Sequence, residues 1–138
     1  MLGGSPRMPW WRRWFGTRSE RAAERFLRRL GYRIVARNYL CPQGELDLIA
    51  VDPDRVVVFV EVRSTASQTD DGPMASIGQE KQRRLTQAAL FFLKQKGLLG
   101  RPARFDVLTL TWPPGQRQPT IRHVPNAFES VGVLQPFT

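Results

Sequence analysis

The sequence predicts a small α/β domain in which helices flank a mixed sheet. Two stretches, residues 17–30 and 78–96, repeat apolar residues at the spacing of one helix face. Strand-like stretches rich in β-branched and aromatic residues lie between them, separated by turn-forming residues, and another follows the second helix. A strand, a helix and a strand in succession need a crossover connection, so we expect parallel and antiparallel neighbours in the order αβββαβ.

The N-terminal residues 1–16 are rich in Gly, Pro, Arg and Trp, and we expect them to form a flexible basic and aromatic arm. The first helix then begins at Thr17, because Thr17 and Glu20 have the spacing of a capping box. Gly31 suits its C-terminal end. Three roles stay open for the arm: docking on nucleic acid, anchoring at a membrane interface, or none.

Five strands are predicted, with the last as an edge strand: residues 32–38, 45–51, 56–63, 104–112 and 120–124. The third is apolar on both faces until Glu61, as expected of a central strand. Residues 64–76 are polar and predict a long loop. The chain therefore divides into the arm, one domain over residues 17–128 and a tail over residues 129–138.

The composition favours a polyanionic partner. The chain has 21 Lys and Arg against 12 Asp and Glu, a formal charge of +9, which favours DNA first and RNA second. Cys41 and His123 stand alone, which excludes an internal disulfide framework and histidine-rich metal sites. The longest apolar run, residues 56–60, is too short to span a bilayer, and no signal peptide is recognisable, so we expect a cytoplasmic protein.

The hairpin from Gly44 to Arg63 carries the candidate chemistry. A carboxylate in an apolar strand, such as Glu61, needs a compensating cation or donors. A three-residue turn would set Asp47 directly opposite Glu61, and two adjacent carboxylates make sense if a divalent cation lies between them. A two-residue turn would put them on opposite faces. The alternative is a simple ion pair between Glu61 and Arg63 or another base.

A third carboxylate could come from Glu20 on the first helix, whose alternative role is the cap beside Thr17. Two or three carboxylates with waters form an oxygen-only site that suits Mg²⁺ or Mn²⁺. Such a metal activates water and stabilises the charge that develops during phosphodiester cleavage. Basic residues in the first half of the second helix would hold the phosphate backbone: Lys81, Arg83 and Arg84.

Several spaced motifs in one order resemble the YraN family of small bacterial proteins. They are Gly44-Glu-Leu-Asp-Leu-Ile-Ala, Phe59-Val-Glu-Val-Arg, Lys81-Gln-Arg-Arg-Leu and Arg104-Phe-Asp-Val, preceded by Glu20, Ala22-Ala23, Gly31-Tyr and Arg37-Asn38-Tyr. The resemblance covers about residues 16–128. That family is similar to the PD-(D/E)XK nucleases, especially Holliday-junction resolvases, whose restriction-endonuclease-like core is also αβββαβ.

The resemblance implies that Asp47, Glu61 and Glu20 are metal ligands and that Asp47, Glu61 and Arg63 form the catalytic set. The family position of Arg63 is usually lysine, which can approach neutrality, whereas arginine keeps its charge. Two functions follow, a metal-dependent endonuclease acting on branched or nicked DNA and a non-catalytic DNA- or RNA-binding module on the same fold. A third is an interaction protein using the Trp-rich arm. A resolvase-like role would favour a homodimer.

Overall fold

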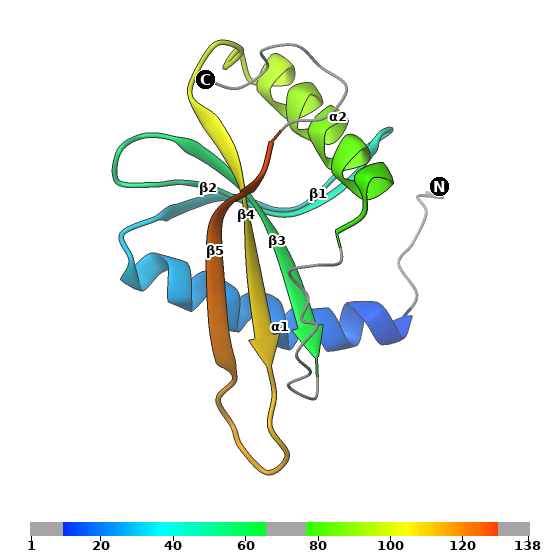
Figure 1. The fold of residues 1–138 in the computed structure, drawn as a ribbon, viewed down its shortest axis with the longest axis vertical. Coiled ribbons are helices and arrows are strands. Elements are labelled where there is room, and N and C mark those ends of the chain that lie inside the picture. The colour runs from blue at the N-terminus through cyan, green and yellow to red at the C-terminus, as the bar shows by residue number, and fades with distance from the viewer. Residues whose placement is uncertain (1–9, 66–76, 130–138) are drawn as a thin grey trace.

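The computed structural model describes residues 10–65 and 77–129, which form a five-stranded sheet with a helix on each face (Figure 1). The elements in chain order are α1 (Trp10–Arg29), β1 (Arg33–Cys41), β2 (Gly44–Val51), β3 (Val57–Thr65), α2 (Gln79–Gln95), β4 (Ala103–Thr111) and β5 (Thr120–Phe128).

The strands follow one another across the sheet in the order β1-β2-β3-β4-β5. β3 and β4 run parallel, because α2 carries the chain back between them, and every other neighbouring pair is antiparallel. The predicted αβββαβ core with a mixed sheet flanked by helices is therefore confirmed, and β5 adds the predicted edge strand.

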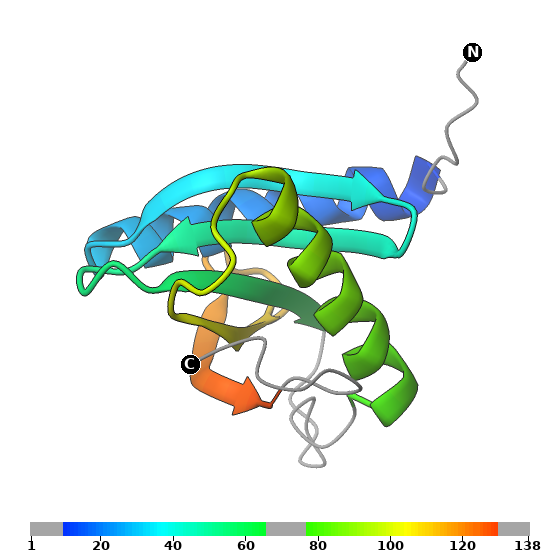
Figure 2. The same ribbon diagram turned by 90° about the horizontal axis from the view of Figure 1, so that it is seen from above.

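Each face of the sheet carries its own apolar core, and the two helices lie on opposite faces (Figures 1 and 2). The α2 face is centred on Phe59, which contacts the rings of Phe92 and Phe105 at centroid distances of 5.9 and 5.7 Å. The α1 face packs Leu27 against Leu108 and neighbouring residues of the central strands. β3 is thus buried on both faces, as its apolar sequence predicts.

Helix α1 is longer than predicted, and the predicted capping box is wrong. The helix begins at Trp10, so Thr17 and Glu20 lie in its interior. No proline interrupts residues 10–29, and the single Gly16 costs a helix only about 1 kcal/mol. The predicted end is confirmed, since Gly31 adopts a φ of 91° and donates its N–H to the carbonyl of Arg28 at 3.0 Å. Residues 1–9 of the predicted arm, 66–76 of the predicted loop and 130–138 of the predicted tail lie outside the described residues.

The β2–β3 hairpin has the predicted register, in which Ile49 faces Phe59 and Val51 faces Val57. Its turn has three residues, because the N–H of Asp52 donates to the carbonyl of Val56 at 3.0 Å.

The polar residues of the Arg104-Phe-Asp-Val motif form a buried network that stabilises the sheet. The Arg104 guanidinium reaches Asp52 at 2.7 Å, Asp106 at 2.9 Å and the hydroxyl of Tyr32 at 2.7 Å. Asp106 is 0% exposed and also lies 2.8 Å from Nε2 of His123. These groups connect the β2–β3 turn to β4 and β5, so the motif has a structural role in the sheet.

Candidate active site

Two carboxylates lie side by side on the α2 face, where β2 and β3 meet. The last ladder pair is Leu48 with Val60, Asp47 and Glu61 are the next residues along the two strands, and both line the same pocket, where their charges interact. Asp47 is 7% exposed and Glu61 8%. The N–H of Val62 donates to Oδ2 of Asp47 at 2.8 Å. The Asp47 side chain thus connects β2 to β3 just past the last pair of the ladder, Leu48 and Val60. The sequence-predicted pair is thus formed.

The surroundings of Asp47 disfavour its negative charge. Burial is the main reason that the pKa of Asp47 is raised well above its usual value, and the neighbouring charge of Glu61 raises it further. The hydrogen bond from Val62 acts in the opposite direction. The charges of Glu20 and Glu45 add smaller contributions to the rise. Either a proton or a cation would relieve this repulsion.

A lysine from α2 completes the described cluster. Nζ of Lys81 lies 2.8 Å from Oε2 of Glu61, and the Lys81 side chain is 44% exposed while that of Glu61 is 9% exposed. Lys81 lies in the first turn of α2, so the helix presents its ammonium group directly to β3. The cation that contacts Glu61 therefore comes from a residue predicted to hold the phosphate backbone.

The cluster opens into a pocket of about 160 Å³. Its lining comes from the start of β2, from β3 and from the first half of α2: Gly44, Glu45, Asp47, Glu61, Lys81, Arg84 and Leu85. Glu45 was missed as a site residue, although its spacing of two from Asp47 on a strand is a signal that both carboxylates lie on one side. The pocket brings three carboxylates and two cations to one opening, which is an arrangement suited to a phosphate and a divalent ion together.

Glu20 does not join Asp47 and Glu61. Its Oε1 accepts a hydrogen bond from the side-chain amide of Asn38 at 3.2 Å. Within residues 10–65 and 77–129, no group of three His, Cys, Asp or Glu side chains is arranged to hold a metal ion. Glu20 lies on α1, which packs on the opposite face of the sheet from α2, so the described geometry offers two facing carboxylates.

The other predicted site residues lie around this pair. Arg63 is half-buried on β3, two residues beyond Glu61, and pairs in the parallel ladder with Thr109. Arg83 and Arg84 project from α2 and contact Glu80 at 3.3 and 3.4 Å. Their side chains are 46% and 57% exposed, so both remain accessible to a ligand.

Two facing carboxylates fit Mg²⁺ or Mn²⁺ by the chemistry of their donors. These ions prefer oxygen ligands and are commonly held by one or two carboxylates, with waters and substrate phosphates completing the shell. The raised pKa of the buried Asp47 is the second reason for the fit, because a divalent ion would balance the repulsion between its carboxylate and that of Glu61.

Comparison with known proteins places the chain in a family. The model of "Uncharacterised protein family UPF0102" matches residues 19–110. The chain belongs to this family. UPF0102 is the YraN family that the spaced motifs indicate, so that resemblance is confirmed.

UPF0102 proteins of several species are similar to this chain over most of its length. The protein of Desulfosudis oleivorans is 42% identical over 119 residues, which cover 86% of this chain and 93% of the relative. That of Myxococcus xanthus is 43% identical, with 86% and 92% covered. The Pseudomonas aeruginosa protein is 40% identical over 116 residues, with 83% and 92% covered.

Among solved structures, SfsA of Pyrococcus furiosus in complex with Ca²⁺ is similar at a TM-score of 0.37 and 15% sequence identity. The match covers 82% of this chain and 63% of SfsA. No helix in the described ranges is long and apolar enough to cross a membrane.

Proposed function

We propose that this UPF0102 protein binds nucleic acid at the pocket between α2 and the β2–β3 hairpin and hydrolyses phosphodiester bonds there with a divalent metal. The observation that carries the proposal is the buried, facing pair of Asp47 and Glu61 with Lys81 2.8 Å from Glu61. A buried carboxylate with a raised pKa in a cleft, as at Asp47, is typical of a functional site.

The basic charge of the chain supports nucleic acid as the partner. The formal charge is +9, and α2 presents Lys81, Arg83 and Arg84 at the same end of the sheet as the carboxylate pair. These side chains would contact the phosphate backbone, which positions a nucleic acid without reading its sequence. DNA is the first candidate and RNA the second.

Asp47 and Glu61 would hold Mg²⁺ or Mn²⁺. When bound, the ion supplies a Lewis acid for the scissile phosphate and lowers the pKa of a water molecule. Oδ2 of Asp47 accepts the N–H of Val62, so the backbone holds this carboxylate in a fixed orientation beside Glu61. Glu20 would act from a distance, through its charge, or through a water molecule.

On this proposal Lys81 and Arg63 together take the role of the lysine that usually occupies the position of Arg63. Arg63 keeps its charge at all times and would hold a phosphate oxygen, whereas a lysine can release or accept a proton at Nζ. Lys81 lies beside Glu61, so its ammonium group can neutralise charge on the phosphate or donate a proton to the leaving oxygen. On this proposal Lys81→Met lowers the cleavage rate by a larger factor than Arg83→Met, which alters a neighbouring cation of α2.

The test is cleavage of junction, nicked and linear DNA with Mg²⁺ or Mn²⁺. Asp47→Asn should abolish cleavage, since removal of one metal-ligand charge commonly costs a factor of about 100 or more. Asp54→Asn is the matched control, because Asp54 is exposed in the β2–β3 turn. Equal activity of wild type and Asp47→Asn would remove Asp47 from the mechanism.

The second candidate is a binding module that does not cleave, and Arg63 in place of lysine favours it. This module would show salt-dependent affinity for DNA or RNA with no metal-dependent turnover. Replacing Lys81, Arg83 and Arg84 together by Ala should reduce the slope of log K against log salt by about 2 to 3. An unchanged slope would place the binding surface elsewhere. A symmetric homodimer and a cytoplasmic location remain predictions of the sequence.

A further inference from the structure

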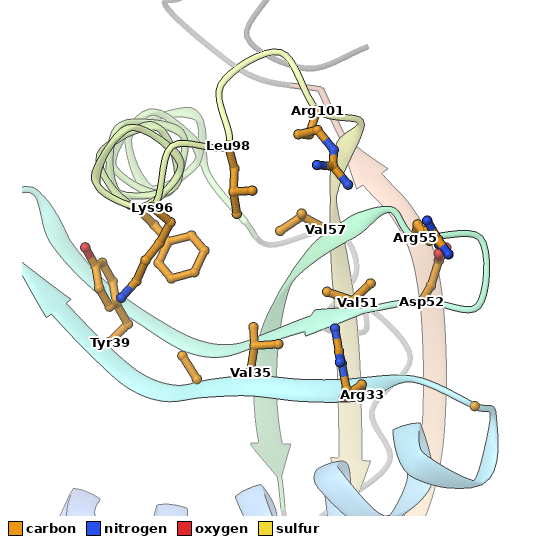
Figure 3. A pocket seen from close by; sticks show the side chains of 13 residues that line it. Arg33, Val35, Tyr39, Val51, Asp52, Arg55, Val57, Lys96, Leu98 and Arg101 are labelled. Carbon is orange, nitrogen blue, oxygen red and sulfur yellow. The ribbon is translucent and has the colours of Figure 1, made fainter.

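A second and larger pocket lies on the α2 face of the sheet, beside the C-terminal half of that helix (Figure 3). Its volume is about 770 Å³, within the range of sites that hold small ligands or short segments of chain. The walls come from β1, the β2–β3 turn, the end of α2 and the segment that leads into β4.

The floor of the pocket is mainly aliphatic, with the rings of Tyr39 and Phe92 at its α2 side. Val51, Val57 and Leu98 line it together with Val35, and Figure 3 shows these side chains in its middle. Val35 is 45% exposed although it is a β-branched residue within a strand. The sheet is therefore not fully covered by α2 here, and an apolar surface is left open.

Four cations surround this floor: Arg33, Arg55, Lys96 and Arg101. Figure 3 places the arginines on one side and Lys96 on the other. Among the described residues none of these four forms an ion pair. The one carboxylate in the lining, Asp52, is already bound to the guanidinium of Arg104 at 2.7 Å. Although Nζ of Lys96 lies 6.0 Å from the ring centroid of Phe92, the rim has a net positive charge that no carboxylate of the described residues neutralises.

This pocket is separate from the carboxylate pair. Lys81 lines the candidate active site and Lys96 lines the second pocket, and 15 residues of helix correspond to about 22 Å. The two pockets have no lining residue in common.

We propose that this basic pocket binds a short acidic peptide segment of a partner protein, in which aspartate or glutamate alternates with aliphatic residues. The carboxylates would pair with the guanidinium groups of the rim, bidentately where an arginine fork is available. The aliphatic side chains would cover the exposed part of the floor, each fully buried one contributing about 1.5 to 3 kcal/mol before the cost of ordering the peptide.

The shape and chemistry of the pocket favour a peptide over the other anionic partners. Nucleic acid without sequence preference is commonly held by aromatic stacking surfaces. Here the two rings of the lining pack edge-on against each other, Tyr39 on Phe92 at 5.1 Å, and the Tyr39 hydroxyl donates to Gln95 at 2.6 Å, so the rest of the floor offers aliphatic side chains in place of a stacking surface. A second copy of this chain is disfavoured as the partner because its formal charge is also +9.

The test is fluorescence polarisation of the full chain with a labelled hexapeptide that alternates aspartate and leucine. Two probes serve as references, an aspartate–serine hexapeptide of equal charge and a single-stranded thymidine hexanucleotide. The aspartate–leucine peptide should bind at least about tenfold more tightly than either. Arg33→Glu should weaken its binding by about tenfold or more, and Val35→Ser by a few fold.

Arg117→Glu is the matched control, since Arg117 is exposed in the β4–β5 turn and makes the same change in net charge. It should alter the affinity by less than about twofold. Asp47→Asn should leave peptide binding unchanged, so a failure of the proposed nuclease activity does not affect this result. The proposal is overturned if the hexanucleotide or the serine peptide binds as tightly, if Arg117→Glu acts like Arg33→Glu, or if no saturable binding occurs up to about 1 mM.

Discussion

Replacing Asp47 by asparagine should make the protein more stable when no divalent metal is present. Asp47 is 7% exposed and faces Glu61, which is 8% exposed, so its negative charge is both desolvated and repelled. Asparagine has the same shape and keeps a carbonyl oxygen that can accept the hydrogen bond from Val62. The substitution therefore removes an unfavourable charge while the backbone donor stays satisfied.

The magnitude follows from the geometry of the pair. Like charges directly opposite each other in a sheet cost up to about 1 kcal/mol, and burial adds to this. We expect Asp47→Asn to raise the free energy of unfolding by about 1 kcal/mol, which corresponds to about 3 to 5 °C in a domain of this size. Because the pKa of Asp47 is raised on folding, its stabilising contribution is complete in acid and is lost as the pH rises through that pKa. The gain from Asp47→Asn should grow over the same range.

The assay is urea unfolding followed by tryptophan fluorescence over a series of acid to neutral pH values. It is run first with a chelator and then with Mg²⁺ or Mn²⁺. The metal should stabilise the wild type by RT ln(1 + [M]/Kd) and the variant much less. Asp54→Asn should behave like the wild type throughout. A variant that is less stable than the wild type in the chelator would refute the reasoning, because it would mean that the ionised Asp47 is already compensated.

Three further predictions concern the fold. Asp106→Asn should lower the free energy of unfolding by about 3 kcal/mol in chemical denaturation. Burial raises the pKa of Asp106, but hydrogen bonds from His123 and its other partners leave that pKa below the usual value. The stabilising contribution of the Asp106 carboxylate is therefore lost as the pH falls through this pKa, and the stability of the variant should approach that of the wild type in acid. The hydrogen bond from Arg37 is the main factor that lowers the pKa of Glu24 to about 2. In Arg37→Ala this pKa should therefore rise toward its ordinary value in an NMR titration, and an unchanged pKa would assign the shift to other groups. Phe59→Ala should lower the free energy of unfolding by about 3 to 5 kcal/mol in the same denaturation, since Phe59 is 2% exposed in the core on the α2 face. A decrease of less than about 1 kcal/mol would contradict that packing.

Local patterns were enough to predict the hairpin that carries the site. Turn residues at Asp52 to Arg55 indicate a tight hairpin of two or three connecting residues, and the structure selects three; alternation then determines which side chains face each other. The adjacency of Asp47 and Glu61 follows from those two facts, both of which are local in sequence. The start of α1 was predicted wrongly because the Gly- and Pro-rich composition of residues 1–16 does not show that the helix already begins at Trp10.

Contacts between elements distant in sequence could not be predicted in this way. The ion pair between Lys81 and Glu61 depends on where α2 crosses the sheet, which hydrophobic periodicity does not specify. Likewise Arg104 reaches Asp52 and Tyr32 only because β4 pairs with β3 beside the β2–β3 turn. That Glu20 does not complete a metal-binding group of three with Asp47 and Glu61 among the described residues depends on where α1 packs on the sheet.

The sequence by itself determined the element order and the family and limited the hairpin to two registers, because periodicity, turn residues and motif spacing are properties of short stretches of chain. Only the tertiary structure decided which cation contacts Glu61, that Glu20 stands apart, and that four cations surround an uncovered aliphatic floor beside α2. These depend on the angle and position at which helices pack on a twisted sheet, and that packing is set by the whole core and not by any one segment.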